Sequence, residues 1–204
     1  MRVISGKYKG KKLKGFDIDG TRPTMDRVKE SLFATIQNYI PESKCLDLFA
    51  GSGALGIEAL SMGASSCDFI DHNMTSINTI KENTLNIKEN YNIINIDYKK
   101  YLKTTNKKYD IIFLDPPYQN KLLNKSLKYI EEYGLLNEGG IVVCEYEVEE
   151  PLCNYTIISE KKYGTKKIKI YERQGNWFLA LIFLQNYKFN ILATFLATNL
   201  PKPP

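Results

Sequence analysis

The stretch Lys44-Cys-Leu-Asp-Leu-Phe-Ala-Gly-Ser-Gly-Ala-Leu-Gly-Ile-Glu-Ala-Leu60 decides the fold. The apolar run 45–49 predicts a buried strand, the segment GSGALG (51–56) predicts a tight turn, and the residues through Leu60 predict a helix. Glycines between a strand and a helix let the backbone approach a ligand closely and direct helix N–H groups toward it. The pattern G-x-G-x-x-G is shared with dinucleotide-binding proteins, so it predicts a ligand site without identifying the ligand.

Strand and helix patterns alternate on both sides of this stretch, in a chain of 204 residues that can bury a full core. Upstream, Val28, Leu32 and Ile36 follow helical spacing, with Thr24 or Asp26 as the expected N-cap. The predicted strands after the glycine turn are 66–71, 93–96, 109–114 and 140–146, with a closing hairpin of 155–159 and 167–171. The predicted helices are 76–86 and 122–133. Repeated strand–helix units predict an α/β fold, with a mostly parallel sheet covered by helices on both faces.

The chain is expected to hold one domain, residues 1–173, followed by an apolar extension, residues 174–204. Within the domain, residues 1–20 are expected to form a basic N-terminal hairpin or arm, and residues 21–173 are expected to form the core that carries the functional site. The extension is apolar over 177–200, but polar residues interrupt it near its middle. A membrane span needs about 20 mainly apolar residues, so we expect no membrane association. The sequence does not give the role of this extension.

Three acidic residues are expected at the carboxyl ends of the first three strands. Asp47 lies within the first strand, where it could accept hydrogen bonds from the ammonium group of an amino-acid-like ligand. Asp71 ends the second strand and is placed to take both hydroxyls of a ribose, whereas Asp97 follows the third strand and precedes Tyr98. Three such acids suit a cationic sulfonium ligand better than a pyrophosphate. The alternative is that they are helix caps and loop acids.

The tetrapeptide Asp115-Pro-Pro-Tyr118 follows a strongly apolar strand and carries the most information about the reaction. The Asp115 carboxylate and the Pro116 carbonyl could each accept one N–H of a base amino group. Pro116 and Pro117 stiffen the loop, because proline fixes φ and lacks an N–H. Tyr118 could stack on the base, and catalysis would be mostly positioning for an in-line methyl transfer. The alternative is a proline-rich turn without a catalytic role.

Basic residues are concentrated at the N-terminus, in a chain whose net charge is +5. The candidates for contact with nucleic-acid phosphates are Lys7, Lys9, Lys11 and Lys12. A solvated basic arm is the equally weighted alternative. The four cysteines show no metal-ligand spacing, so neither a metal site nor a disulfide framework is expected. Together with the absence of an N-terminal apolar run, this favours the cytoplasm.

These motifs together resemble the bacterial 16S rRNA guanine-N2 methyltransferases of the RsmD type, within the class I methyltransferases. The resemblance runs from Arg2 to about Arg173 and includes MRVISGKYKGKKL, TRPTMDRVKESLF, LDLFAGSGALGIEAL, FLDPPY and YGTKKIKIYER. It implies a seven-stranded Rossmann-like sheet with an N-terminal hairpin extension. It also implies S-adenosyl-L-methionine as cofactor, and as partner 16S rRNA in the small ribosomal subunit or a late assembly intermediate. We expect a monomer.

The resemblance also implies roles for particular residues. The expected cofactor-binding residues are Asp47, Phe49, Gly51, Gly53, Asp71, Asp97, Tyr98, Arg22 and Thr24. The expected catalytic residues are Asp115, Pro116, Pro117 and Tyr118, and the basic arm is expected to contact RNA. The family usually has Glu at the position of Asp71, so the shorter acid could reach the ribose less well. The extension beyond about Gln174 matches nothing in the family pattern.

Three other functions fit part of the sequence. An adenine-N6 DNA methyltransferase uses a similar tetrapeptide, but no stretch here is long enough for a target-recognition domain. A noncatalytic RNA-binding assembly factor would leave Asp115 and the glycine turn without a purpose. A nicotinamide-dependent oxidoreductase would leave the tetrapeptide unexplained, and His72, the single histidine, is a poor proton donor beside Asp71.

Overall fold

The computed structural model describes residues 1–15, 22–117 and 121–175 of the chain. The chain divides into two units, residues 1–173 and 174–204. The strands of the first unit are β1 Lys44–Asp47, β2 Ser66–Asp71, β3 Asn90–Asn95, β4 Tyr109–Leu114, β5 Leu136–Tyr146, β6 Thr156–Tyr163 and β7 Lys166–Glu172. The helices are α1 Arg22–Ile36, α2 Ala54–Ser61, α3 Met74–Asn83, α4 Tyr98–Thr104 and α5 Leu122–Glu132, with a 3-10 turn η1 at Gln37–Tyr39.

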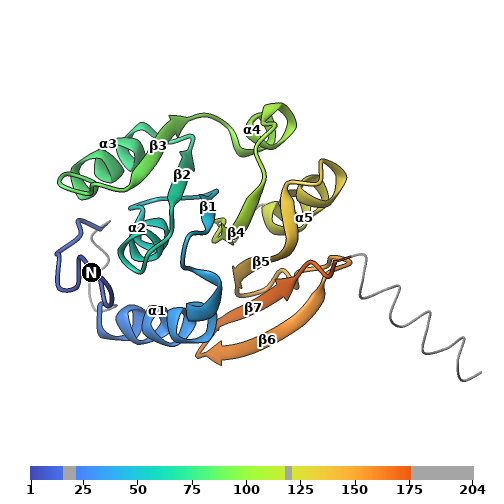
Figure 1. Ribbon diagram of the computed structural model, residues 1–204. Coiled ribbons are helices and arrows are strands. Elements are labelled where there is room, and N and C mark those ends of the chain that lie inside the picture. The colour runs from blue at the N-terminus through green and yellow to red at the C-terminus, as the bar shows by residue number, and fades with distance from the viewer. Residues whose placement is uncertain (16–21, 118–120, 176–204) are drawn as a thin grey trace, which may run out of the picture. The chain divides into compact units, whose positions relative to one another are not determined.

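The strands form one seven-stranded sheet in the order β3-β2-β1-β4-β5-β7-β6 (Figure 1). The neighbours from β3 to β5 pair in parallel, and β7 runs antiparallel to both β5 and β6. The amino end of β7 therefore lies at the same edge of the sheet as the carboxyl ends of the other strands. The prediction of a mostly parallel sheet closed by a hairpin is confirmed.

Helices cover both faces of the sheet and bury two apolar clusters. The first cluster joins α1 and α2 to the sheet face that presents Phe113 of β4 and Val143 of β5. The second joins α4 and α5 to the opposite face, which presents Ile112 and Leu114. Because side chains alternate along a strand, consecutive residues of β4 serve different clusters, and this explains its uninterrupted apolar sequence.

The segment 1–15, here called the N-terminal segment, folds back on itself and packs against α2. An antiparallel bridge joins Arg2 to Lys12, as expected for a small hairpin. The buried carboxylate of Glu58 in α2 accepts hydrogen bonds from the backbone N–H groups of Ile4 (2.9 Å) and Ser5 (2.7 Å). It also forms an ion pair with the buried Lys29 of α1 at 2.8 Å. The Glu58 carboxylate thus joins α2 to the N-terminal segment by hydrogen bonds and to α1 by an ion pair.

The structure corrects some predicted boundaries. The first helix begins at Arg22 rather than after a cap at Thr24 or Asp26, because proline is tolerated in the first turn of a helix. The short helix α4 was not predicted, and β5 begins at Leu136 rather than at residue 140. In the described part of the chain, no helix has the length and apolar character needed to cross a membrane. The apolar stretch 177–200 lies outside the described residues.

Candidate functional site

Four acidic residues lie at the carboxyl ends of the first four strands, as predicted: Asp47, Asp71, Asp97 and Asp115. The chain fills the sheet outward from β1 to β3 and then crosses to β4 on the other side of β1. Open α/β sheets bind ligands at such a switch point, outside the carboxyl ends of the strands. Asp47 ends β1 and Asp115 follows β4, so these two acids flank the switch point.

The glycine turn has the backbone geometry of a ligand-binding loop. Gly53 precedes α2 with a φ of 77°, a left-handed conformation that glycine adopts without a steric penalty. A Cβ atom on Gly56 would lie 2.3 Å from a ring carbon of Phe69, so α2 can approach β2 this closely only with glycine there. The amino end of α2 is therefore held at the switch point, where its N–H groups favour an anionic or polar ligand group.

Two of the acids support this turn through hydrogen bonds. The buried carboxylate of Asp47 accepts a hydrogen bond from the Gly56 N–H at 3.0 Å through Oδ2. Asp71 accepts one from the Gly51 N–H at 3.0 Å and another from the Asn73 N–H at 2.8 Å. A carboxylate has about four lone-pair sites, so Asp71 retains capacity for a ligand hydroxyl despite these two bonds.

The buried carboxyl group of Asp47 is costly to ionise, and a nearby cation would reduce this cost. Burial raises the pKa of its carboxyl group to about 7, the Gly56 N–H opposes this shift, and the charge of Asp71 adds to it. A carboxylate that is costly to ionise in the protein alone becomes favourable when a positive ligand group lies beside it. A positively charged ligand group beside Asp47 would therefore favour its ionised form, and the predicted contact with a sulfonium or ammonium group stays a prediction.

Replacing Asp47 with Asn should stabilise the protein in the absence of ligand. The pKa of about 7 in the folded protein lies above the ordinary value of 3.8 for this carboxyl group, so the wild-type protein loses stability as pH rises from 4 to 7. Each pKa unit is worth about 1.4 kcal/mol, so Asp47→Asn should gain up to about 4 kcal/mol at pH 8 and almost nothing at pH 4. Urea unfolding of both proteins at several pH values measures this. A difference that does not change between pH 4 and 8 would contradict the assignment.

Asp97 serves as a helix cap, which was the alternative reading of its sequence position. Its Oδ1 accepts hydrogen bonds from the N–H groups of Lys99 (3.0 Å) and Lys100 (3.1 Å) at the start of α4. The cap places an exposed acid at the edge beside a pair of aromatic rings, Phe49 and Tyr98, whose centroids are 5.3 Å apart. Capping and ligand binding are compatible, because only one carboxylate oxygen caps the helix.

The tetrapeptide after β4 begins with an acid in a negative environment. Asp115 is half-buried, Pro116 is buried and Pro117 is exposed. Burial raises the pKa of Asp115, the nearby Glu145 raises it further, and Lys166 lowers it. Like charges beside a carboxylate increase its tendency to accept N–H donors or to hold a proton. Tyr118 lies outside the described residues, so its predicted stacking role stays a prediction.

The predicted roles of Arg22 and Thr24 also stay predictions. Both residues lie in the first turn of α1, and the structure describes the backbone there but not the side chains.

Two lysines of the predicted basic arm, Lys7 and Lys11, contact other parts of the domain. Lys7 forms an ion pair with Glu89 at 2.5 Å, and its ammonium lies 5.4 Å from the ring centre of Tyr8. The ammonium of Lys11 donates to the backbone carbonyl of Leu85 at 2.7 Å. Lys9 and Lys12 are exposed. Lys7 and Lys11 thus attach the segment to the domain, and the predicted contact of all four lysines with RNA stays a prediction.

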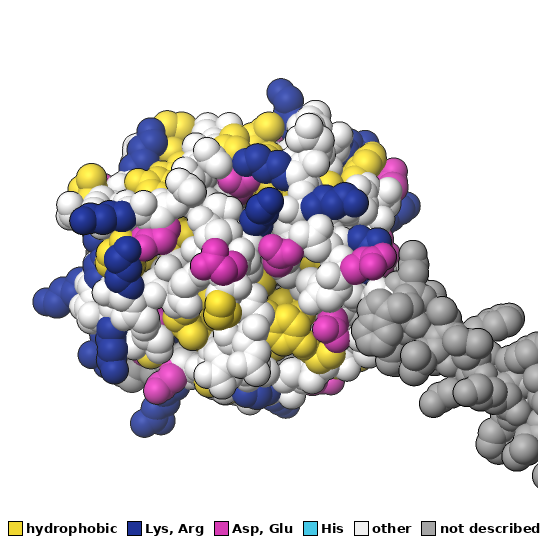
Figure 2. Space-filling view, viewed as in Figure 1, with side chains coloured by type: hydrophobic (Ala, Val, Ile, Leu, Met, Phe, Trp, Pro, Cys, Tyr) yellow, Lys and Arg dark blue, Asp and Glu magenta, His cyan; other side chains and the backbone are white. Residues whose placement is uncertain are grey.

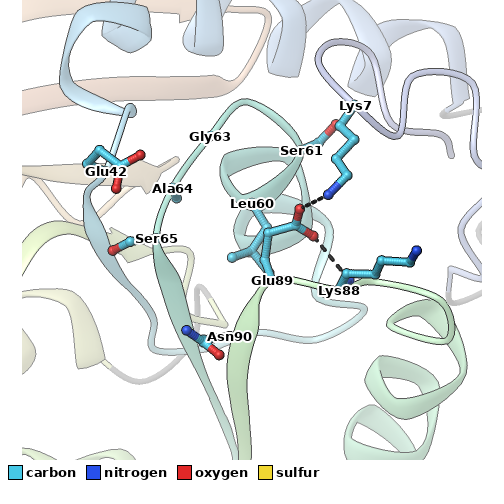
Figure 3. A pocket seen from close by; sticks show the side chains of 10 residues that line it. All are labelled: Lys7, Glu42, Leu60, Ser61, Gly63, Ala64, Ser65, Lys88, Glu89 and Asn90. Carbon is cyan, nitrogen blue, oxygen red and sulfur yellow. Dashed lines mark hydrogen bonds and ion pairs between the residues drawn. The ribbon is translucent and has the colours of Figure 1, made fainter.

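The hollow beside Lys7 is not the ligand site (Figure 3). It has a volume of about 320 Å³ and is lined by residues that include Ser61, Ser65 and Asn90. Ser65 immediately precedes β2 and Asn90 begins β3, so the hollow lies at the amino ends of the strands. The acids and the glycine turn are at the opposite edge, where a parallel sheet binds its ligands.

Comparisons with known proteins agree with this geometry. The family described as conserved hypothetical protein 95 matches residues 1–172. The chain belongs to this family.

YlbH of Bacillus subtilis is 40% identical over 184 residues, which cover 86% of this chain and 100% of YlbH. Ribosomal RNA small subunit methyltransferase D of Haemophilus influenzae is 36% identical over 180 residues, covering 84% of this chain and 93% of that protein. The solved structure of Escherichia coli yhhF has a TM-score of 0.77 and 32% identity, covering 85% of this chain and 98% of that one.

The match confirms the resemblance that the sequence motifs predicted, and it includes the N-terminal segment and the β6–β7 hairpin. Sequence reasoning nevertheless missed two residues near the site, Glu145 of β5 and Lys166 of β7. A signal existed for Glu145, because it is the single acid in the apolar run Ile141–Tyr146. Lys166 has no comparable signal, because it is one of several lysines in its strand.

Proposed function

We propose that this member of the family is a methyltransferase that uses S-adenosyl-L-methionine to methylate the exocyclic N2 amine of a guanine in small-subunit rRNA. The observation that carries the proposal is the position of Asp47 and Asp115 on either side of the switch point, beside a glycine turn. The similarity to small-subunit methyltransferase D of Haemophilus influenzae supports rRNA as the substrate class. We also propose that the enzyme acts in the cytoplasm.

The described residues fit this cofactor. Asp47 lies closest to the switch point and suits the positively charged end of the ligand, because its buried carboxylate lacks a cationic partner among the described residues. Asp71 and Asp97, at the ends of β2 and β3, suit the ribose and the adjoining base. Phe49 and Tyr98 provide an apolar surface there. When bound, S-adenosylmethionine supplies a methyl group activated by a sulfonium sulfur.

The residues after β4 would handle the amine. Its lone pair is delocalised into the base, so it attacks only when its hydrogens are held and the nitrogen is correctly placed. The Asp115 carboxylate and the Pro116 carbonyl each accept one N–H, and the two prolines keep these acceptors in place. Transfer leaves the nitrogen with one proton too many, and the raised pKa of Asp115 makes its carboxylate a competent acceptor for that proton.

The RNA would approach over the basic edge of the domain. On the face shown in Figure 2, Lys and Arg side chains are most crowded along the left edge, near the N-terminal segment and α3. Asp and Glu side chains lie nearer the middle of that face. We expect the lysines at this edge to contact RNA phosphates and the acids at the carboxyl edge of the sheet to contact the base. This arrangement suits an enzyme that takes one base out of its stack.

Replacing Lys9 and Lys12 together with Ala should weaken RNA binding and flatten its salt dependence. Each phosphate contact contributes about 0.7 to the slope of log affinity against log salt for single-stranded RNA, so the slope should fall by about 1.4. A filter-binding titration at several salt concentrations measures it. Lys125→Ala with Lys128→Ala on α5 removes the same charge from the opposite face and should leave the slope nearly unchanged. Equal slopes for both double variants would remove the N-terminal segment from the RNA surface.

The proposed function is tested by transfer of tritiated methyl groups from S-adenosylmethionine to unmodified small ribosomal subunits, naked 16S rRNA and duplex DNA. The product is digested and the modified nucleoside identified. N2-methylguanosine in subunits or rRNA is the expected result, and the comparison between them separates an assembled particle from free rRNA as substrate. Methylated adenine in DNA would overturn the substrate. Cofactor binding without transfer to any of the three would favour a noncatalytic assembly factor.

A further inference from the structure

Glu145 and Lys166 lie beside Asp115 at the carboxyl edge of the sheet. Leu114 of β4 pairs with Cys144 of β5, so the residues that follow them, Asp115 and Glu145, are neighbours. Asp115 lies two residues after Phe113, and Glu145 lies two residues after Val143. Because side chains alternate along a strand, both point to the sheet face covered by α1.

Lys166 reaches the same place from the next strand. It begins β7, whose antiparallel direction puts its amino end at this edge. Its ammonium forms an ion pair with Glu145 Oε1, and the side chains of Lys166 and Glu145 are 34% and 13% exposed. After burial, Glu145 and Lys166 have the largest influences on the pKa of Asp115. Ile168 is the residue directly opposite Glu145, so Lys166 lies diagonally from Glu145 on the same sheet face. The three charged groups thus lie on the adjacent strands β4, β5 and β7 and are here called the row.

The stability of the sheet does not explain this row. A partly exposed ion pair contributes little to folding, and a second carboxylate beside Asp115 is unfavourable because like charges repel. Charged groups that do not stabilise the fold and that lie beside a reactive residue are candidates for binding the substrate. A carboxylate has about four lone-pair sites and an ammonium has three donors, so each group can form a hydrogen bond to a ligand in addition to its contacts within the protein.

The row matches the Watson–Crick edge of guanine. That edge presents the O6 acceptor, the N1–H donor and the N2 amine in sequence, and enzymes that take a base out of its stack read this edge by hydrogen bonds. Across the sheet, Lys166 is a donor, Glu145 is an acceptor and Asp115 is an acceptor. Adenine with its amine at Asp115 would turn the N1 lone pair toward Glu145 and offer Lys166 no acceptor.

We propose that Glu145 and Lys166 select guanine, Glu145 by accepting a hydrogen bond from N1–H and Lys166 by donating one to O6. The inference rests on the proposed function, since it assumes that a guanine N2 amine lies at Asp115. A site built to hydrogen-bond a polar group discriminates strongly against an analogue that lacks it, because the groups of the site are then left unpaired.

The test uses two rRNA fragments that differ at the target nucleotide, one with guanosine and one with 2-aminopurine riboside. The analogue keeps the 2-amino group but has no O6 and carries a lone pair at N1 in place of N1–H. The wild-type enzyme should prefer guanosine by at least about 100-fold in kcat/KM, given losses of this size for unmatched polar groups. Glu145→Gln should lose at least about tenfold on guanosine and lose less, or gain, on 2-aminopurine, because the Gln amide can donate to N1. Lys166→Met should lower activity on guanosine and leave activity on 2-aminopurine within about twofold.

Glu147→Gln is the matched control. Glu147 also adjoins this edge, but its carboxylate accepts a hydrogen bond from the hydroxyl of Thr165 at 3.1 Å. This variant should keep the wild-type ratio between the two substrates. Binding of S-adenosylmethionine, measured by calorimetry, shows that each variant is folded. If the wild-type enzyme methylates no guanine, the proposed function fails. If it methylates guanine and Glu145→Gln keeps the wild-type preference, the base-reading role fails alone.

Discussion

Replacing Asp115 with Ala should reduce methyl transfer by at least about 1000-fold, while the affinity for S-adenosylmethionine changes by less than about tenfold. Loss of one preorganised polar contact to a reacting group typically costs 10²- to 10³-fold, and Asp115 also holds the nitrogen in line for attack. The cofactor should be affected less, because Asp47 and the glycine turn remain in place. Single-turnover transfer and calorimetric titration of the cofactor measure the two effects separately.

Asp115→Asn distinguishes an acceptor from a base. The amide keeps one oxygen acceptor, so this variant should retain more activity than Asp115→Ala. The wild-type enzyme should gain kcat/KM as pH rises through the raised pKa of Asp115, since the ionised form accepts the N–H bond. The charged groups that influence the pKa of this carboxyl group are Glu145, Asp47 and Glu147, which raise it, and Lys166, which lowers it. The Asn variant should lose this pH dependence.

The stability of the Asp115 variants provides the control. Removing a charge from a cluster of acids should leave the free energy of unfolding unchanged or higher, because the raised pKa shows that ionisation is unfavourable there. If Asp115→Ala instead unfolds the domain, or loses cofactor binding as completely as methyl transfer, Asp115 has a structural role.

The sequence predicted the parts of the site that are local in the chain. A strand, a glycine turn and a helix lie within Lys44–Leu60, and their spacing alone requires the backbone that the structure shows. Asp115 was predictable because prolines mark the end of an apolar strand. The mostly parallel sheet was predictable from repeated strand–helix units, whereas the crossover from β3 to β4 on the other side of β1 had no signal in the sequence.

The contacts that the sequence could not predict join residues far apart in the chain. Lys7 and Glu89 are 82 positions apart, so nothing local indicates that this lysine is already paired. The row formed by Asp115, Glu145 and Lys166 depends on the order of three strands and on their register. Side-chain alternation fixes the face of each residue, but only the topology makes the three neighbours.

Replacing Glu58 with Ala should destabilise the protein by about 3–5 kcal/mol, the usual effect of removing one partner from a buried ion pair. Glu58 is fully buried, and Lys29, 2.8 Å from it, would lose its carboxylate partner. The backbone N–H groups of Ile4 and Ser5 would also lose their acceptor. Urea unfolding measures the total effect, and hydrogen exchange in residues 1–15 should increase more than in the sheet.

A double variant separates the charge from the hydrogen bonds. Glu58→Gln with Lys29→Met removes both charges but keeps an amide oxygen that can accept the N–H groups of Ile4 and Ser5. It should recover most of the lost stability, because a neutral pair of similar size avoids the uncompensated charge. It should also restore protection from exchange in the N-terminal segment. If the double variant is as unstable as Glu58→Ala, the ion pair itself stabilises the protein.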